Sequence, residues 1–159
     1  ALRMSLDEPA TPEQLDRVEA VIDAWLGEAS ASNPVVGAVE RGEPGERRWY
    51  VRVHGEEKDV YSIWFTLGQR TLAYDTFLMP APEEHHAVLY EHLLRRNLKL
   101  YGVQLAIGAE DAIFLVGHLA VDHVDEDALD WVLGTVYAAV ELCFRPAIRI
   151  GFASKFGDR

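Results

Sequence analysis

Three histidines near the middle of the chain are the first candidates for chemistry. His85 and His86 are neighbours, and His92 follows seven residues after His85 in the same predicted helix. Two zinc ligands on one helix normally stand three or four residues apart, with a third group converging on the metal. His85 and His92 miss this spacing. A metal site at His85 and His86, with oxygen from Glu83 or Glu84, is therefore the alternative to solvated helix histidines, and the leading prediction is no metal and no cofactor.

A second pair of histidines flanks an acid. His118 and His123 stand on either side of Asp122, where a strand is predicted to lead into a helix. Such a cluster can move protons, but acid–base catalysis needs a reacting group positioned beside it. The single cysteine, Cys143, lies among apolar residues, and no serine has the glycine context of a nucleophile turn. No catalytic residue is predicted. A small-ligand-binding protein or a metal-dependent enzyme that uses either histidine cluster is the alternative.

The elements that must position these residues follow from periodicity. Residues 71–79 are mostly β-branched and aromatic, which predicts a strand. A proline turn at residues 80–82 leads to a predicted helix over residues 83–99, with acids at its start and bases at its end. Strands over residues 103–107 and 113–119 follow, joined by a turn at residues 108–111. The helix carries a wide apolar stripe that must cover a sheet: Val88, Leu89, Leu93, Leu94, Leu98 and Leu100.

The flanking segments complete an α+β arrangement. Thr11, Pro12 and Gln14 form a capping box that begins a first helix. Residues 48–54 and 60–67 are predicted strands that form a meander with residues 71–79, whereas residues 35–40 are interpreted as either a strand or an irregular edge. The last helix runs from near Asp125 to residue 144, and Pro146 is predicted to end it. The prediction is a five-stranded antiparallel sheet in the order α-βββ-α-ββ-α, in a single domain over residues 1–159.

Composition narrows the kinds of partner. Of the 159 residues, 49% are hydrophobic, so the chain can bury a substantial core. The net charge of −11 disfavours nucleic acid and anionic membranes, and it suits a basic or neutral protein partner. One cysteine permits no intramolecular disulfide, no apolar run reaches the ~20 residues of a membrane span, and residues 1–9 lack a signal pattern. We therefore expect a cytoplasmic protein without a membrane partner.

The last helix has more apolar surface than one sheet face can hide. Apolar residues cover nearly its whole circumference, so it is predicted either to lie between two layers or to contribute an oligomer contact. We expect a homodimer formed through this helix or through a sheet edge. The four tryptophans, Trp25, Trp49, Trp64 and Trp131, are typical of a core, but their number also leaves open an apolar groove that binds a partner.

Five segments carry a resemblance to a known family. They are Gly-Glu-Glu-Lys-Asp at residues 55–59, Leu-Gly-Gln-Arg-Thr-Leu at 67–72, Met-Pro-Ala-Pro-Glu-Glu at 79–84, Leu-Leu-Arg-Arg-Asn at 93–97 and Phe-Arg-Pro-Ala at 144–147. This sequence resembles the YbjN-like family of bacterial sensory transduction regulators, whose fold is similar to that of type III secretion chaperones. The resemblance implies a noncatalytic module that acts through protein contacts, often as a homodimer.

The family offers no catalytic residues to carry over, so the resemblance implies binding residues only. The surface candidates are the motif positions Arg70, Pro80, Pro82, Glu83, Glu84, Arg95, Arg96 and Asn97. For the prolines, turn formation is the simpler interpretation. The identity of the protein partner does not follow from the sequence.

Overall fold

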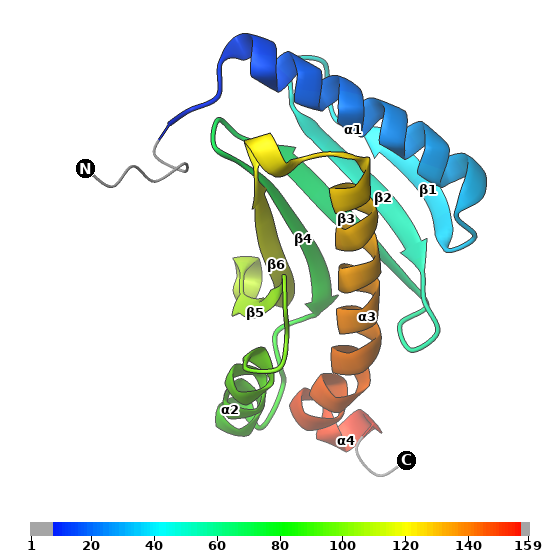
Figure 1. Cartoon of the computed structure of the whole chain (residues 1–159). Coiled ribbons are helices and arrows are strands. Elements are labelled where there is room, and N and C mark those ends of the chain that lie inside the picture. Colours follow the sequence, from blue (N-terminus) through cyan, green and yellow to red (C-terminus); the bar gives the residue numbers. More distant parts are fainter. Residues whose placement is uncertain (1–7, 157–159) are drawn as a thin grey trace.

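The computed structural model describes residues 8–156, and in this part of the chain six antiparallel strands form one sheet (Figure 1). The order across the sheet is β1-β2-β3-β4-β6-β5. The elements are α1 (Pro12–Ser32), β1 (Val36–Arg41), β2 (Arg48–His54), β3 (Val60–Leu67), β4 (Thr71–Met79), α2 (His86–Asn97), β5 (Gln104–Ile107), η2 (Ala109–Asp111), β6 (Ile113–Ala120), η3 (Val121–His123), α3 (Glu126–Gly151) and α4 (Ala153–Phe156). The prediction that residues 1–9 lack a signal pattern falls mostly on residues 1–7, which lie outside the described residues.

The prediction of five strands is wrong, because the run at residues 35–40 forms a sixth. β1 pairs with β2, with Val39 opposite Val51 and Glu40 opposite Tyr50. The register shifts between Val36 and Ala38. This irregularity breaks the alternation of apolar and polar residues, so the pattern in the sequence did not distinguish a strand from an irregular edge. The observed order is α-ββββ-α-ββ-α, followed by the short α4.

One face of the sheet holds the core. Alternate residues of β2, β3 and β4 are buried, as the period-two pattern predicts, and α1 and α3 lie over this face (Figure 1). Trp25 of α1 packs edge-on against Phe65 of β3, with 5.9 Å between the ring centroids. The capping box of Thr11 and Gln14 is confirmed at the start of α1. Within residues 8–156, no helix packs on the centre of the opposite face of the sheet (Figure 1).

Helix α2 is shorter than predicted and covers less. It begins at His86 rather than at residue 83, because the amides of Glu83 and Glu84 donate to the carbonyl of Gly151 and His85 adopts a left-handed φ of 56°. Only Leu89 and Leu93 of the predicted apolar stripe are buried. α2 lies at the end of the sheet, beside α3 and β5, so a narrow stripe is enough to cover its contact (Figure 1).

Helix α3 is longer than predicted, since Pro146 lies inside it and does not end it. A proline removes one backbone hydrogen bond to the carbonyl four residues earlier, here that of Leu142. Leu142 is exposed, so its carbonyl can be hydrated. The turn beyond Pro146 is held by packing, because Gly151 lies against Met79, Pro82 and Leu89. Residues 147–151, beyond the predicted end at Pro146, are therefore the last part of this helix.

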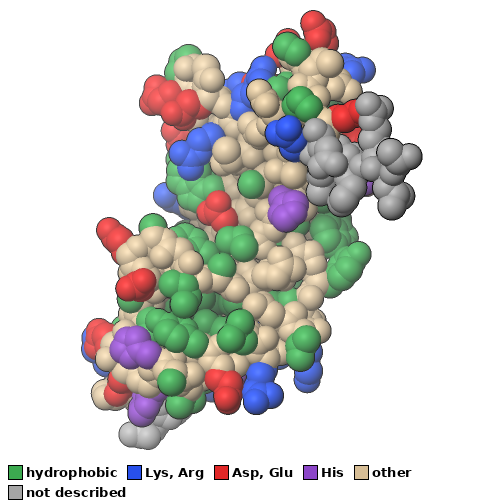
Figure 2. All heavy atoms as spheres, turned by 90° about the vertical axis from the view of Figure 1, so that its left-hand side faces the viewer, with side chains coloured by type: hydrophobic (Ala, Val, Ile, Leu, Met, Phe, Trp, Pro, Cys, Tyr) green, Lys and Arg blue, Asp and Glu red, His purple; other side chains and the backbone are tan. Residues whose placement is uncertain are grey.

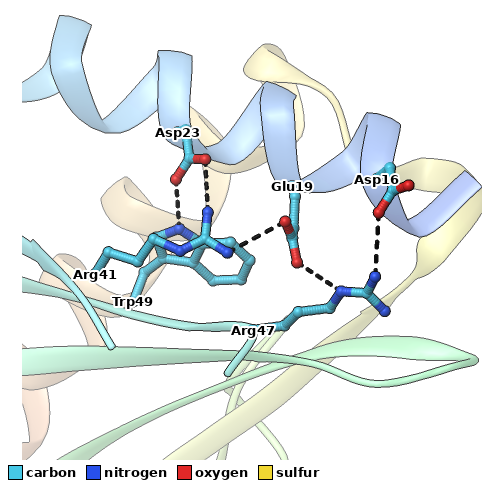
Figure 3. A network of polar contacts seen from close by, with 6 residues as sticks. All are labelled: Asp16, Glu19, Asp23, Arg41, Arg47 and Trp49. Carbon is cyan, nitrogen blue, oxygen red and sulfur yellow. Dashed lines mark hydrogen bonds and ion pairs between the residues drawn. The ribbon is translucent and has the colours of Figure 1, made fainter. Parts of the chain in front are cut away.

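Two arginines of the β1–β2 hairpin fasten α1 to the sheet (Figure 3). Arg41 contacts Asp23 at 2.7 Å and Glu19 at 3.1 Å, and the indole of Trp49 donates to Asp23 at 2.8 Å. Arg47 donates to Glu19 at 2.5 Å. Burial alone would raise the pKa of Glu19, but the hydrogen bonds and charges of the two arginines outweigh burial and hold its pKa below the ordinary value. Glu19 therefore links both arginines to the helix.

Glu19→Gln should lower the free energy of unfolding by about 1 kcal/mol at pH 7, the upper range for partly exposed ion pairs. A carboxylate with a lowered pKa stabilises the fold above its ordinary pKa, and this contribution is lost as the pH falls through the folded value. The difference between wild type and variant should therefore shrink in acid, measured by urea unfolding at several pH values. Glu28→Gln, an exposed acid of the same helix, is the control. Equal effects of the two variants would contradict this role of Glu19.

Candidate functional site

The most exposed large apolar side chains lie at the end of α2 and in the connection to β5. Leu98 is 89% exposed, Tyr101 is 83% exposed and Leu94 is 69% exposed. Trp131 of α3 stands edge-on to Tyr101, with 5.9 Å between the ring centroids. We call Leu94, Leu98, Tyr101 and Trp131 the α2 surface. Figure 2 shows hydrophobic side chains gathered over the region of α2 and β5, with charged side chains around them.

The backbone beneath the α2 surface is fixed. Gly102 has a φ of 82°, and a Cβ atom there would stand 2.4 Å from the ring of Trp131. The Tyr74 hydroxyl donates to the carbonyl of Gly102 at 2.7 Å. Only glycine fits this close approach and this left-handed conformation. The exposed side chains therefore project from an ordered connection, which reduces the entropy lost when a partner binds.

Helix α3 adds exposed apolar residues on its outer side, including Trp131 and Leu142. On length and composition alone α3 is able to cross a bilayer, as are the core helices of many globular domains. Here 39% of its most apolar window is buried in the described chain. Nine residues of α3 are buried, so the predicted excess of apolar surface on this helix is limited to side chains such as Trp131 and Leu142, and the strongest exposure lies on α2.

The open face of the sheet is a second candidate surface. The register places Tyr50, Trp64, Asp75 and Val116 side by side in one row across β2, β3, β4 and β6. Tyr50 and Trp64 stand 4.9 Å apart between ring centroids. Next to this row, Phe77 of β4 meets Phe114 of β6 edge-on at 5.8 Å. We call these six residues the open-face row.

Asp75 is the acid in the middle of the open-face row. It is half-buried, and within residues 8–156 no hydrogen bond or ion pair engages its carboxylate. Burial raises the pKa of Asp75, and the charge of Arg48 opposes this only in part. A charge that the fold leaves without a partner destabilises the protein, so Asp75 is a candidate for a role other than folding.

The motif at residues 79–84 holds the end of the last helix. The amides of Glu83 and Glu84 donate to the Gly151 carbonyl at 3.0 and 3.1 Å. The carboxylate of Glu84 accepts from the amide and hydroxyl of Ser154, and these hydrogen bonds lower its pKa. Lys155 pairs with Glu83 at 3.0 Å. Pro82 is buried against Gly151, whereas Pro80 is exposed. These contacts give the motif at residues 79–84 a structural role.

Asn97 completes the edge of the sheet. Its side-chain amide donates to the Leu105 carbonyl at 3.2 Å and accepts from the Leu105 N–H at 2.7 Å. The amide thus takes the place of a neighbouring strand beside β5. Of the other predicted surface residues, Arg95 pairs with Glu91 at 3.6 Å, Arg96 is half-buried, and Arg70 is exposed with its carbonyl bound by Val121. As partner-binding residues, all of them stay predictions.

The histidines do not form a common site. His85 lies 3.9 Å from Glu84, and His86 stands edge-on to Tyr90. His118 lies on the open face, whereas His123 lies in η3. Within residues 8–156 no group of three or more His, Cys, Asp or Glu side chains is arranged to hold a metal ion. Cys143 is buried, and burial raises the pKa of its thiol.

Two hollows accompany these surfaces. One, of about 480 Å³, lies between α1, the β3–β4 turn and η3, and Arg17, Arg70 and Asp122 line it together with valines. The other, of about 420 Å³, lies between the end of α1 and α3. Neither is lined by a histidine. Neither hollow is therefore a site for the predicted clusters at His85 and His86 or at His118 and His123.

The sequence reasoning missed three of these features. It assigned Leu94 and Leu98 to the buried stripe, although they lie more than 90° around the helix from Leu89, at 100° per residue. The sequence did contain a signal for a site at Asp75, because this acid lies in a predicted strand whose other residues are uncharged. Tyr101 gave no signal, because its contact with Trp131 depends on the path of the connection.

Comparison with known proteins identifies the family. Residues 14–149 match the YbjN family, whose description is "putative bacterial sensory transduction regulator". The match covers most of the chain, and the protein belongs to this family.

Individual relatives agree with this assignment. Uncharacterized proteins of Mycobacterium bovis and Mycobacterium tuberculosis are 35% identical over 104 residues, which cover 65% of this chain and 57% of theirs. A Mycobacterium leprae protein is 33% identical over 110 residues, which cover 69% of this chain and 60% of its own. The matched part is thus about three fifths of the length of these relatives.

A solved structure confirms the predicted likeness to type III secretion chaperones. The Yersinia pestis chaperone SycH, in a complex with a stable fragment of YscM2, superposes with a TM-score of 0.50 at 16% identity. The superposition covers 77% of this chain and 96% of that chain. At this identity the likeness shows the fold alone.

Asn97→Ala should lower the free energy of unfolding by about 1–3 kcal/mol, because it leaves the Leu105 N–H and carbonyl without partners. It should also promote association through the bared edge of β5. Urea unfolding and light scattering measure the two effects. Lys99→Ala, at an exposed neighbouring position, is the control. An unfolding free energy equal to that of the control would refute the edge-pairing role.

Asp75→Asn should raise the free energy of unfolding at pH 7. A raised pKa means that the fold disfavours the carboxylate, and this cost is present above the folded pKa and disappears below the unfolded value of about 3.9. The gain should therefore shrink as the pH falls. Thermal unfolding of wild type and variant between pH 7 and acid measures it. A variant that is less stable than wild type at pH 7 would show that Asp75 has a stabilising partner.

Proposed function

We propose that this chain is a noncatalytic protein-interaction module, chaperone-like or regulatory, that forms a homodimer through the α2 surface. The observation that carries the proposal is the exposure of Leu94, Leu98 and Tyr101 on an ordered backbone. Contiguous exposed apolar side chains of this size usually mark an interaction site. The complex of SycH with a fragment of YscM2 supports the idea that this fold binds protein partners. The family description supports a regulatory role.

The α2 surface suits a second copy of the chain. At a net charge of −11, two copies repel each other unless they meet at an uncharged patch. Glu91 and Arg95 lie beside Leu94 on α2 and carry opposite charges, so two antiparallel α2 helices can pair the acid of one with the base of the other. The predicted contact ran through the last helix or a sheet edge. In the proposed arrangement the last helix contributes Trp131 alone, and Asn97 already occupies the edge of β5 at Leu105.

The energetics favour a dimer of moderate strength. Burying the exposed side chains of Leu94, Leu98 and Tyr101 in each copy is worth on the order of 10 kcal/mol. Association costs about 4–15 kcal/mol in lost freedom of motion. At the lower end of that cost the surplus is about 6 kcal/mol, which corresponds to a dissociation constant of tens of micromolar, roughly 40 μM.

Leu98→Glu should shift the protein to a monomer without loss of stability, because the side chain is exposed in the single chain and a charge at the contact opposes burial. Sedimentation velocity from about 1 to 100 μM measures the weight-average mass, a range chosen to bracket micromolar affinity. Val60→Glu, at an exposed position on β3, is the control and should leave the dimer intact. A wild-type protein that stays monomeric throughout would refute the homodimer, and a variant that dimerises like wild type would move the contact elsewhere.

A further inference from the structure

The open-face row has the composition of a binding surface. Its rings come from Tyr50, Trp64, Phe77 and Phe114, and its aliphatic member is Val116. In an antiparallel sheet, directly opposite residues have Cβ atoms about 5 Å apart, so Asp75 lies between Trp64 and Val116. The solvent-facing side of an antiparallel sheet normally carries polar side chains. This row is aromatic, with one acid at its centre.

Aromatic rings around a carboxylate form a receptor for a cation. The ring faces attract a positive charge, and the carboxylate supplies a charge-assisted hydrogen bond. The chain itself shows that these rings accept cations. The guanidinium of Arg48 lies 4.9 Å from the centre of the Trp64 ring, and the ammonium of Lys58 lies 4.9 Å from that of Phe77. Neither forms an ion pair with Asp75.

We propose that the open-face row binds a basic segment of a partner protein, whose lysine or arginine pairs with Asp75 between the aromatic rings. This inference rests on the proposed function, because the partner is a protein, but it uses a surface distinct from the α2 surface. A single partner cation would neutralise this half-buried carboxylate, which no hydrogen bond or ion pair engages within residues 8–156. The apolar residues that flank this cation would cover Trp64 and Phe77.

Charge favours a basic partner over other ligands. The net charge of −11 attracts basic proteins over long range and raises their rate of association. A nucleic acid would place phosphates against Asp75 and against the same net charge, which opposes binding. Arg48, Arg52, Glu40 and His118 also face this side of the sheet, and Lys58 lies over Phe77, so basic side chains outnumber acidic ones around Asp75. A partner cation must therefore reach the carboxylate of Asp75 itself, between Trp64 and Val116, for the row to prefer it.

The test uses four peptides that differ only at the central residue. The first is acetyl-Ser-Val-Ser-Leu-Arg-Leu-Ser-Val-Ser-amide, and Lys, Gln or Glu replaces Arg in the others. The protein is kept as the full chain, and binding is followed by the shifts of the Trp64 indole and Asp75 amide signals in NMR spectra. We expect the Arg and Lys peptides to bind at least about tenfold more tightly than the Gln and Glu peptides, the loss that follows from one charge-assisted hydrogen bond.

Two variants assign the preference to Asp75. Asp75→Asn should abolish the difference between the Arg and Gln peptides, whereas Asp127→Asn, which removes the same charge from the first turn of α3, should preserve it. Equal affinities of the four peptides for wild type, a preference that survives in Asp75→Asn, or no binding up to about 1 mM, a free energy near −4 kcal/mol, would each overturn the proposal. A stronger response to an oligonucleotide than to the Arg peptide would do the same. Sedimentation of the same samples reports the dimer separately, so failure of this inference is distinguishable from failure of the proposed function.

Discussion

In the described part of the chain the helices cover only one face of the six-stranded sheet, and the rest of the structure depends on this constraint. α1 and α3 bury the inner residues of β2, β3 and β4, while the outer face keeps an aromatic row without a helix on it. The third long element, α2, packs at the end of the sheet beside α3 and β5. Because α2 buries only Leu89 and Leu93, its other apolar side chains must face solvent or a partner.

Several polar contacts maintain this one-sided arrangement. Arg41 and Arg47 tie α1 to the β1–β2 hairpin, and the segment at residues 80–85 ties the end of α3 to the start of α2. Asn97 satisfies the backbone of β5 from outside. These residues explain why motif positions that suggest a binding site, such as Glu84 and Asn97, contact the chain itself. Neither the α2 surface nor the open-face row takes part in these contacts.

Much of this fold could be predicted from local patterns, and the failures have physical causes. The capping box of Thr11 and the alternation in residues 71–79 depend on neighbouring residues only, and both predictions hold. β1 was left undecided because a register shift interrupts its alternation, and Pro146 lies within α3 because packing of Gly151 outweighs the lost hydrogen bond. The candidate sites depend on which elements meet in space. The hydrophobic spacing places Leu98 on an apolar stripe of the helix. It does not show that the sheet ends before it can cover this side chain.

The central claim is that the α2 surface is an interface between protein molecules rather than a solvated end of a helix. Hydrogen–deuterium exchange of the full chain at two protein concentrations, about 1 and 100 μM, tests it directly, since micromolar affinity lies between them. If the chain dimerises through the α2 surface, exchange in residues 91–102 is slower at the higher concentration, with no change in α1. Exchange in residues 91–102 that is independent of concentration would contradict it.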